Sequence, residues 1–253
     1  MTSHAPRAPF RDSFAFELAQ AGRAQRIAMA IVVDDDIEMS SLDLLHDEER
    51  ALLPAPRYAA RRRALIRGRE AAKSALRLLH PQLDPAQVAI LPGEKGRPLV
   101  TGSELAGVGV SLSHISGASV AVAFPETCPI GIDWERIDPI NTEALKRVSR
   151  PRERAEHEDD LTVLTRLWTL KEALAKVVRT GFSVPVETFE TTALTQTDGV
   201  FHAAFTAFPQ HIGTSVSSLH LCLALVTRSD VAPGVLTSQA MARVRLWLET
   251  SPS

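Results

Sequence analysis

Hydrophobic and polar positions in the first third of the chain predict one buried strand followed by helices. Residues 1–25 are polar and contain prolines, so we expect this segment to be loose at its start. Ile27 to Val33 is a continuous apolar run, which predicts a buried strand. Leu44 to Leu53 predicts a short helix. Arg57 to Leu79 predicts a long helix, because apolar residues recur in it at helical spacing and Pro81 follows it.

The middle of the chain predicts short strands separated by turns. Val88 to Leu91 predicts a strand, and the turn E-K-G-R-P at residues 94–98 follows it. Val108 to Leu112 and Ser119 to Phe124 predict a hairpin around the segment S-H-I-S-G-A. Residues 130–137 carry three isoleucines and predict a further strand that enters a core.

The last third of the chain begins with helical patterns and ends with β-like ones. Residues 141–148 and 151–159 predict two short helices, and Thr162 to Arg179 predicts a longer helix that Gly181 ends. Two β-like runs follow, at Phe201 to Phe208 and at Ser215 to Val226. The last predicted element is an amphipathic helix from Leu236 to Leu248.

Each half of the sequence thus gives a strand, helices and then antiparallel strands. This order predicts an α+β protein of two similar α/β halves, residues 1–127 and 128–253. A length of 253 residues is sufficient for two such domains, although the sequence shows no clean internal repeat.

Composition and charge narrow the class of protein. Hydrophobic residues make up 45% and charged residues 23%, as in ordinary globular proteins, and the net charge of −2 argues against nucleic acid as a partner. Two cysteines without a framework of spacings favour reduced thiols in a cytoplasmic protein. The N-terminus lacks a signal-peptide pattern, and no apolar run approaches the roughly 20 residues of a membrane span, so we expect no membrane association.

The predicted strand at 130–137 carries a candidate metal site. Asp133 and Glu135 are two residues apart, so both carboxylates project from the same face of the strand. Their mutual repulsion favours a hard divalent cation such as Mg²⁺, which prefers oxygen ligands. The alternative is an edge strand on which exposed acids prevent aggregation.

The helix at 162–179 carries the second candidate group. Trp168, Glu172 and Lys176 are spaced by four residues and line one side of this helix. Only five lysines stand against 23 arginines in this chain, so the location of each lysine is informative. The alternative is an exposed Glu–Lys pair that contributes a few tenths of a kcal/mol.

Three further segments could bind an anion. Ser113 and His114 lie at a predicted strand end, where a histidine is more often structural. The turn K-G-R-P holds Lys95 and Arg97 and is otherwise only a turn by propensity. The run R-R-R at Arg61 to Arg63, with Arg67 and Arg69 after it, could be a phosphate clamp, a solvated face or a nucleic-acid patch. The positions of these basic residues are Arg61, Arg62, Arg63, Arg67, Arg69, Lys95 and Arg97.

The order of these motifs resembles one known family. K-G-R-P, S-L-S-H, G-I-D-W-E and W-T-L-K-E-A-L-A-K are similar to the motifs of 4′-phosphopantetheinyl transferases of the Sfp type. The resemblance runs from about Leu42 to Phe189 and includes G-F-S-V-P after the key helix. Three of the five lysines, Lys95, Lys171 and Lys176, fall inside these motifs.

The resemblance implies a fold and a reaction. The two halves would be related by a pseudo-twofold, with coenzyme A contacts in residues 1–127 and the metal and catalytic groups in 128–253, and the ligands would lie in the cleft between them. The enzyme would move 4′-phosphopantetheine from coenzyme A to a serine hydroxyl of an apo acyl or peptidyl carrier protein and release 3′,5′-ADP, as a holo-acyl-carrier-protein synthase does. Mg²⁺ would be required, although the sequence does not distinguish it from Mn²⁺.

The resemblance also implies a role for each matching residue. Asp133, Glu135 and Glu172 would bind Mg²⁺, and Glu172 would be the general base. Lys176 would neutralise phosphate charge, and Lys171 would do the same or only support the fold. The remaining residues that would contact coenzyme A are Ser113, His114, Lys95, Arg97 and one of Arg61, Arg62 and Arg63, the arginines meeting its 3′-phosphate.

The second substrate would be an acidic carrier protein from fatty acid, polyketide or nonribosomal peptide synthesis. The basic stretch Lys146 to Arg154 is the docking surface that we expect, and we expect a monomer. Two alternatives stay open, a non-catalytic relative that binds coenzyme A or a carrier, and a nucleic-acid-binding protein. The second is disfavoured because aromatic residues total only 5%.

Three features depart from the family pattern. Trp134 stands where a smaller aliphatic residue is usual, and we expect it to point away from the acids. The second motif reads S-H-I and lacks one hydroxyl. The arginine-rich helix aligns only loosely, so which of its first three arginines meets the cofactor is open.

Overall fold

The chain forms a mixed α/β protein that divides into two compact units. The structure is a computed structural model that describes residues 9–37, 41–154, 160–181, 183–231 and 241–250. The first unit comprises Met1–Phe16 and Arg26–Glu126, and the second comprises Glu17–Gln25 and Thr127–Ser253. The predicted halves did not anticipate that the short segment Glu17–Gln25 groups with the second unit.

The first unit is built on an antiparallel four-stranded sheet, ordered β1-β2-β6-β5. Its strands are β1 (Phe10–Gln20), β2 (Arg23–Val33), β3 (Ile90–Pro92), β4 (Pro98–Val100), β5 (Val108–Ile115) and β6 (Ala118–Pro125), where β3 and β4 form a separate hairpin and the ends of β1 and β2 belong to the second unit. Its helices are α1 (Asp47–Ala51) and α2 (Ala59–Leu79). Its short 3-10 turns are Leu42–Leu44, Pro56–Tyr58, Pro85–Gln87, Glu94–Gly96 and Ser103–Leu105.

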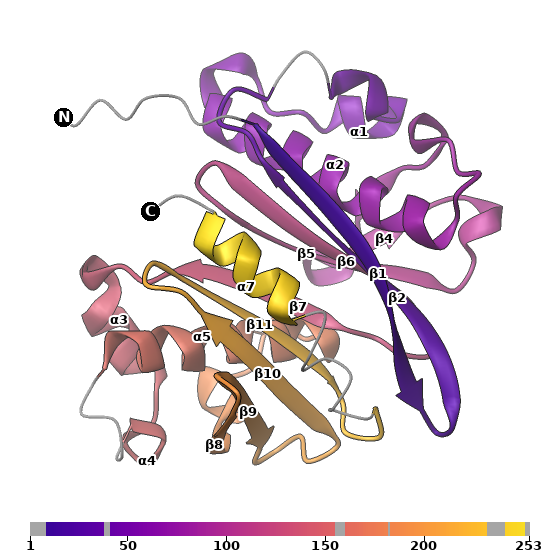
Figure 1. Cartoon of the computed structure of the whole chain (residues 1–253). Helices are drawn as coiled ribbons and strands as arrows, with labels where there is room; N and C mark the ends of the chain where they lie inside the picture. Colours follow the sequence, from indigo (N-terminus) through magenta and orange to yellow (C-terminus); the bar gives the residue numbers. More distant parts are fainter. Residues whose placement is uncertain (1–8, 38–40, 155–159, 182, 232–240, 251–253) are drawn as a thin grey trace. The chain divides into compact units, whose positions relative to one another are not determined.

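Helix α2 lies along one face of this sheet and closes the first core (Figure 1). Ile66 and Leu76 of α2 pack with Ala30 of β2 and Ala121 of β6, all fully buried. The small alanines on the strands allow the helix to lie close to the sheet. The helix ends before Pro81, which cannot continue it, as the sequence predicted.

The second unit is built on an antiparallel five-stranded sheet, ordered β7-β11-β10-β9-β8. Its strands are β7 (Gly131–Arg136), β8 (Thr191–Thr197), β9 (Val200–Phe205), β10 (His211–Ser217) and β11 (Leu221–Arg228). Its helices are α3 (Thr142–Val148), α4 (Pro151–Arg154), α5 (Leu161–Val177) and α7 (Met241–Thr250), with 3-10 turns at Pro139–Asn141 and Val186–Phe189.

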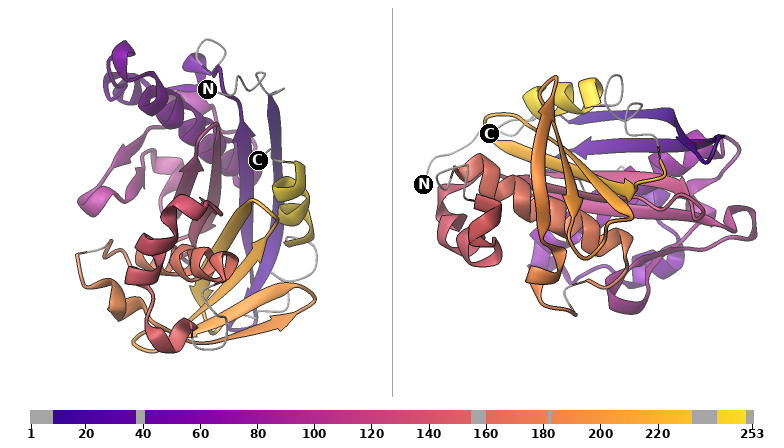
Figure 2. Two further views of the ribbon diagram at one scale, coloured as in Figure 1. Left: turned by 90° about the vertical axis from the view of Figure 1, so that its left-hand side faces the viewer. Right: turned by 90° about the horizontal axis from the view of Figure 1, so that it is seen from below.

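Helices α5 and α7 lie on opposite faces of the five-stranded sheet (Figures 1 and 2). Leu170 and Leu174 of α5 pack against Phe205, Ala224 and other buried residues to form the second core. Asp160 caps α5, because its carboxylate accepts hydrogen bonds from the backbone N–H groups of the first turn. This packing holds α5 across strands β7, β11 and β10.

Most of the predicted elements are confirmed, but one strand was missed and one run was misjudged. The start of the segment 1–25, expected to be loose, lies outside the described residues, and Phe10–Gln20 forms strand β1, which the sequence analysis did not predict and which pairs with β2. Phe14, Phe16 and Leu18 recur at every second position, separated by Ala15 and Glu17, and this is the strand signal that was overlooked. The run predicted from Ser215 to Val226 is two strands, because the chain turns at residues 218–220.

Other boundaries shift by a few residues. The helix predicted from Leu44 is the shorter α1, and α5 ends two residues before Arg179. The helix predicted at 151–159 contains α4, and its remaining residues lie outside the described part of the chain. The closing helix predicted from Leu236 is present as α7, although residues 232–240 lie outside the described residues.

Candidate active site

Strand β7 presents its two acids to helix α5, as the sequence predicted. Asp133 is 3% exposed, and Glu135 is half-buried one pleat further along. Trp134 lies between them on the opposite face and is 1% exposed, so it packs in the core and does not reach the acids.

A glycine allows helix α5 to approach this strand. A Cβ atom on Gly131 would lie 1.9 Å from the carbonyl oxygen of Ala173 in α5. No side chain fits in that space, so the glycine of G-I-D-W-E sets the closeness of strand and helix. This contact brings the acids of β7 within reach of side chains from α5.

The stripe of Trp168, Glu172 and Lys176 on α5 lies over the acidic strand. All three side chains are half-buried, in contrast to the buried residues on either side of them. Trp168 Nε1 donates a hydrogen bond to Glu135 Oε1 at 3.2 Å. Lys176 Nζ lies 2.8 Å from Asp133 Oδ1 and also donates to the backbone oxygen of Ile132 at 2.9 Å. The alternatives of an exposed Glu–Lys pair and of exposed edge acids therefore do not describe these residues.

The carboxylates of this cluster repel one another. Burial and, next, the charge of Asp133 raise the pKa of Glu135 to about 7. Burial and the charge of Asp133 likewise raise the pKa of Glu172 to about 7, while Lys176 opposes this shift. The three acids therefore carry more negative charge than the neighbouring cations balance, and burial limits how far water can screen it. Lys176 supplies only part of the positive charge that would balance them.

The donor set fits a hard divalent cation in chemistry, although the side chains are not arranged around one. Asp133, Glu135 and Glu172 offer only carboxylate oxygens, the ligands that Mg²⁺ prefers. Among the described residues, no group of three or more His, Cys, Asp and Glu side chains is placed to hold a metal ion. The ammonium of Lys176 stands where a cation would neutralise Asp133, so cation binding by all three acids requires side chains to rotate.

A small cavity adjoins Glu135 in the second unit. Its volume is about 300 Å³, and Leu145 and Val148 of α3 line it together with Trp168 and Thr165 of α5. The cavity is therefore half apolar and opens beside the acidic strand.

Lys171 does not point into this cluster. Its side chain is fully buried, and its Nζ lies 2.6 Å from Glu153 Oε2 in α4. The sequence assigned Lys171 to coenzyme A and kept support of the fold as the alternative. The structure corrects that assignment, because a lysine paired inside the core has no surface to offer a ligand.

A basic pocket lies in the first unit. It has a volume of about 540 Å³, and Arg61, Arg63 and Arg67 of α2 line it together with His114 of β5. Asp35 and Asp36, which follow β2, also line it. The pocket thus brings together residues from three segments that are far apart in the sequence.

Arg67 is the most deeply placed of these cations. It is 4% exposed, and its Nη1 donates to the backbone oxygen of Asp34 at 2.7 Å. Its Nε is buried without a hydrogen-bond partner, and burial lowers the pKa of the guanidinium. A buried guanidinium with an unused donor in a pocket is suited to an anion. The sequence placed Arg67 in the basic run without assigning it a ligand.

The other residues that the motifs assigned to coenzyme A do not line this pocket. Arg62 turns away and donates to the backbone oxygen of Pro54 at 3.3 Å. Ser113 is buried on the opposite side of β5 from His114 and does not line the pocket. Arg97 pairs with Glu126 at 2.6 Å, and Lys95 is exposed in the turn at φ 53°. Neither Lys95 nor Arg97 lines this pocket.

Comparison with known proteins finds a family similarity within the second unit. Residues 129–226 match the family model of the 4′-phosphopantetheinyl transferase superfamily. Over this segment, the chain is similar to the 4′-phosphopantetheinyl transferase superfamily. The matched segment of this transferase family contains Asp133, Glu135, Glu172 and Lys176, whereas the basic pocket of the first unit lies outside it.

Three curated phosphopantetheinyl transferases of Bacillus subtilis are similar to the chain. A 4′-phosphopantetheinyl transferase is 33% identical over 112 residues, which are 42% of this chain and 48% of that protein. The 4′-phosphopantetheinyl transferase Sfp of strain 168 is 34% identical over 113 residues, 43% of this chain and 49% of Sfp, and a third, named ffp, is 30% identical over 113 residues. The chain spans about half the length of these relatives. The resemblance to the Sfp type that the motifs predicted is thereby confirmed.

Within the described residues, none of the helices is both long enough and apolar enough to span a membrane.

Proposed function

We propose that this chain transfers 4′-phosphopantetheine from coenzyme A to a serine hydroxyl of an apo carrier protein and releases 3′,5′-ADP. The observation that carries the proposal is the cluster of Asp133, Glu135, Glu172 and Lys176, which joins two motifs of the matched segment. Carboxylates and an ammonium at one place suit the transfer of a phosphoryl group, which is catalysed by positioning and by neutralising charge.

Glu172 is the proposed general base. In the metal-free protein, burial and the charge of Asp133 raise the pKa of Glu172 to about 7, so its carboxylate takes up a proton more readily than an ordinary glutamate does. A base placed in this way typically contributes roughly 10²–10⁴-fold to the rate. In the metal-free protein Asp133 pairs with Lys176, which keeps the ammonium beside the acids. When a cation takes its place at Asp133, this ammonium would be available to phosphate oxygens.

The proposed ligands of a divalent cation are Asp133, Glu135 and Glu172. Mg²⁺ bound there would neutralise the pyrophosphate of coenzyme A and fix the line of attack. Trp168 holds Glu135 by a hydrogen bond, so this carboxylate is oriented before any ligand arrives. Mn²⁺ has similar preferences and is the alternative ion.

The basic pocket of the first unit is the proposed site for a phosphate of coenzyme A. Arg61, Arg63 and Arg67 offer planar guanidinium groups, which suit the oxygens of the 3′-phosphate, and His114 adds a further donor. The assignments of Arg62, Ser113, Lys95 and Arg97 stay predictions from the motifs.

The proposed partner is an acidic acyl or peptidyl carrier protein. Arg147 and Arg150 are exposed and lie within two residues of Val148, which lines the cavity beside Glu135. The side chain of Ile140 is also exposed, at 84%. Basic and apolar groups at one place suit an acidic helical partner. We also propose that the two units are similar halves related by a pseudo-twofold and that the protein acts as a cytoplasmic monomer.

A carrier-dependent release of 3′,5′-ADP tests the proposal. The protein is incubated with coenzyme A, Mg²⁺ and a panel of apo carriers from fatty acid, polyketide and peptide synthesis, and the nucleotide is measured by chromatography. Release should need a carrier and should disappear with Glu172→Gln. Binding of coenzyme A without release on any carrier would favour the alternative, a non-catalytic relative.

A further inference from the structure

A buried ion pair anchors helix α5 directly beside the proposed general base. The Nζ atom of Lys171 lies 2.6 Å from Oε2 of Glu153 in α4, and both side chains are fully buried. Lys171 immediately precedes Glu172 in the sequence. The helix is therefore fixed at the residue next to the group that would take the proton.

Further hydrogen bonds hold this pair in one arrangement. Lys171 Nζ also donates to the backbone oxygen of Val148 at 2.8 Å. Glu153 accepts from the backbone N–H of Arg150 at 2.7 Å and from the N–H and hydroxyl of Thr191 at 2.8 and 2.9 Å. A buried charge pair with such partners specifies one geometry. It joins the end of α3, α4 and the start of β8 to a single residue of α5.

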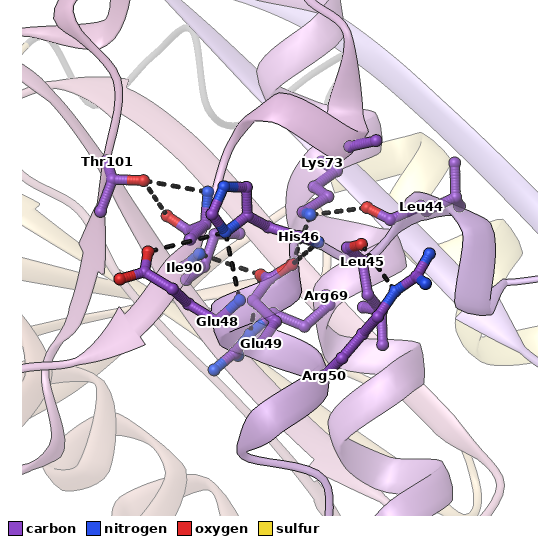
Figure 3. Close-up of polar contacts among 12 residues, drawn as sticks. Leu44, Leu45, His46, Glu48, Glu49, Arg50, Arg69, Lys73, Ile90 and Thr101 are labelled. Carbon is purple, nitrogen blue, oxygen red and sulfur yellow. Dashed lines mark hydrogen bonds and ion pairs between the residues drawn. The ribbon is translucent and has the colours of Figure 1, made fainter.

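The first unit contains a corresponding lysine–glutamate ion pair with a similar set of hydrogen bonds, shown in Figure 3. Lys73 Nζ in α2 lies 2.5 Å from Glu49 Oε2 in α1 and donates to the backbone oxygen of Leu44 at 2.6 Å. Glu49 accepts from the backbone N–H of His46 at 3.0 Å and from that of Ile90 in β3 at 2.9 Å.

The spacings in the two units agree. In each, the lysine bonds a carbonyl five residues before the glutamate, and the glutamate accepts from an N–H three residues before itself. Two features differ. Glu172 follows Lys171, whereas Ser74 follows Lys73. Glu49 also pairs with Arg69 of α2, whose Nε lies 3.2 Å from Glu49 Oε1. The pair is thus part of the general packing of both units, and only in the second unit does it adjoin a carboxylate of the candidate site.

The geometry of a helix links this pair to the site. Successive residues of an α-helix point about 100° apart, so fixing one side chain sets the direction of its neighbours. We propose that the Glu153–Lys171 pair sets the rotation of α5 and thereby aims Glu172 and Lys176 at Asp133. Glu153 and Lys171 are positioning residues, and this inference rests on the proposed function of Glu172.

Matched variants in the two units test the inference. Glu153→Gln and Glu49→Gln each leave a buried lysine without its carboxylate, and both should lower the melting temperature. Only Glu153→Gln should lower kcat, by about tenfold or more at saturating coenzyme A and carrier, since small misplacements of reacting groups slow a reaction strongly. It should also weaken the affinity for Mg²⁺ alone, measured by calorimetry, while Glu49→Gln should keep both quantities within about twofold of the wild type.

A double variant covers the case in which Glu153→Gln does not fold. Glu153→Gln with Lys171→Met replaces the ion pair by neutral side chains, an exchange that buried pairs often tolerate. It should fold and show the same losses in kcat and Mg²⁺ affinity, because the anchor is still absent.

Several outcomes would overturn the inference. One is a folded Glu153→Gln or double variant with wild-type kcat and wild-type Mg²⁺ affinity, which would make the pair purely structural. Another is an equal loss in Glu49→Gln, which would mean a general loss of stability. If the wild type transfers nothing to any carrier, the proposed function fails, and the Mg²⁺ affinities of the two variants still decide the positioning role. A wild type that neither transfers nor binds Mg²⁺ overturns both.

Discussion

Replacing Glu172 by glutamine should stabilise the metal-free protein at alkaline pH while it abolishes transfer. The pKa of Glu172 is raised from 4.5 to about 7 by burial and by the charge of Asp133. The folded state therefore holds the proton more tightly than the unfolded chain does. This contribution to stability is full below about pH 4.5 and is lost as the pH rises through about 7.

The expected size of the effect follows from that shift. At about 1.4 kcal/mol for each pKa unit, an isolated group with this shift would change the free energy of unfolding by roughly 3 kcal/mol. Solvent screens a partly exposed side chain, and Glu135 shares the repulsion from Asp133. We therefore expect Glu172 to change the free energy of unfolding by about 1–2 kcal/mol.

Urea unfolding at pH 5 and pH 8 with EDTA present measures this difference. The free energy of unfolding of the wild type should fall from pH 5 to pH 8. For Glu172→Gln this fall should be smaller by about 1–2 kcal/mol. Glu187→Gln, which changes an exposed glutamate of the same unit, is the matched control and should follow the wild type. If Glu172→Gln shows the same pH dependence as the wild type, Glu172 does not share a desolvated cluster with Asp133 and the reasoning is wrong.

Three further predictions concern the packing and the two binding surfaces. Gly131→Ala should destabilise the protein by at least about 2 kcal/mol in urea unfolding, because the new methyl group would collide with the backbone of α5. Gly68→Ala within α2, whose Cβ would make an ordinary contact 4.0 Å from Leu112, should stabilise the protein by up to about 1 kcal/mol, and a tolerated Gly131→Ala would contradict the close contact. Arg67→Met should weaken the affinity for coenzyme A about tenfold in calorimetry, while the affinity for 3′-dephospho-coenzyme A should stay within about twofold of the wild type. An equal loss of affinity for both ligands would mean that the 3′-phosphate does not bind in this pocket. Reversing the charges of Arg147 and Arg150 to Glu should raise KM for the carrier and leave coenzyme A affinity unchanged, and two unchanged constants would place docking elsewhere.

The core of the candidate site could be predicted because periodicity decides which side chains share a face. Alternation along β7 placed Asp133 with Glu135 and Trp134 apart from them, and the four-residue spacing placed Glu172 with Lys176. These relations depend only on local backbone geometry, so the sequence contains them.

Other residues could not be assigned in this way because their partners are distant in the sequence. Lys171 shares a motif with Glu172, yet its partner Glu153 lies in a separate short helix that the pattern of residues does not connect to it. The pocket is formed by α2 together with β5 and the turn after β2. The sequence of α2 alone therefore does not show which of its first three arginines line the pocket. Strand β1 was missed although its alternation was visible, because the polar residues around it outweighed three apolar positions.

Intact-protein mass spectrometry of the carrier tests the central claim most directly. An apo carrier is incubated with this protein, coenzyme A and Mg²⁺, beside a carrier in which the acceptor serine is alanine. We expect a mass gain of one phosphopantetheine group on the first carrier, no gain on the second, and no gain with Glu172→Gln. An unchanged carrier mass across the whole panel, with folded protein and bound coenzyme A, would contradict it.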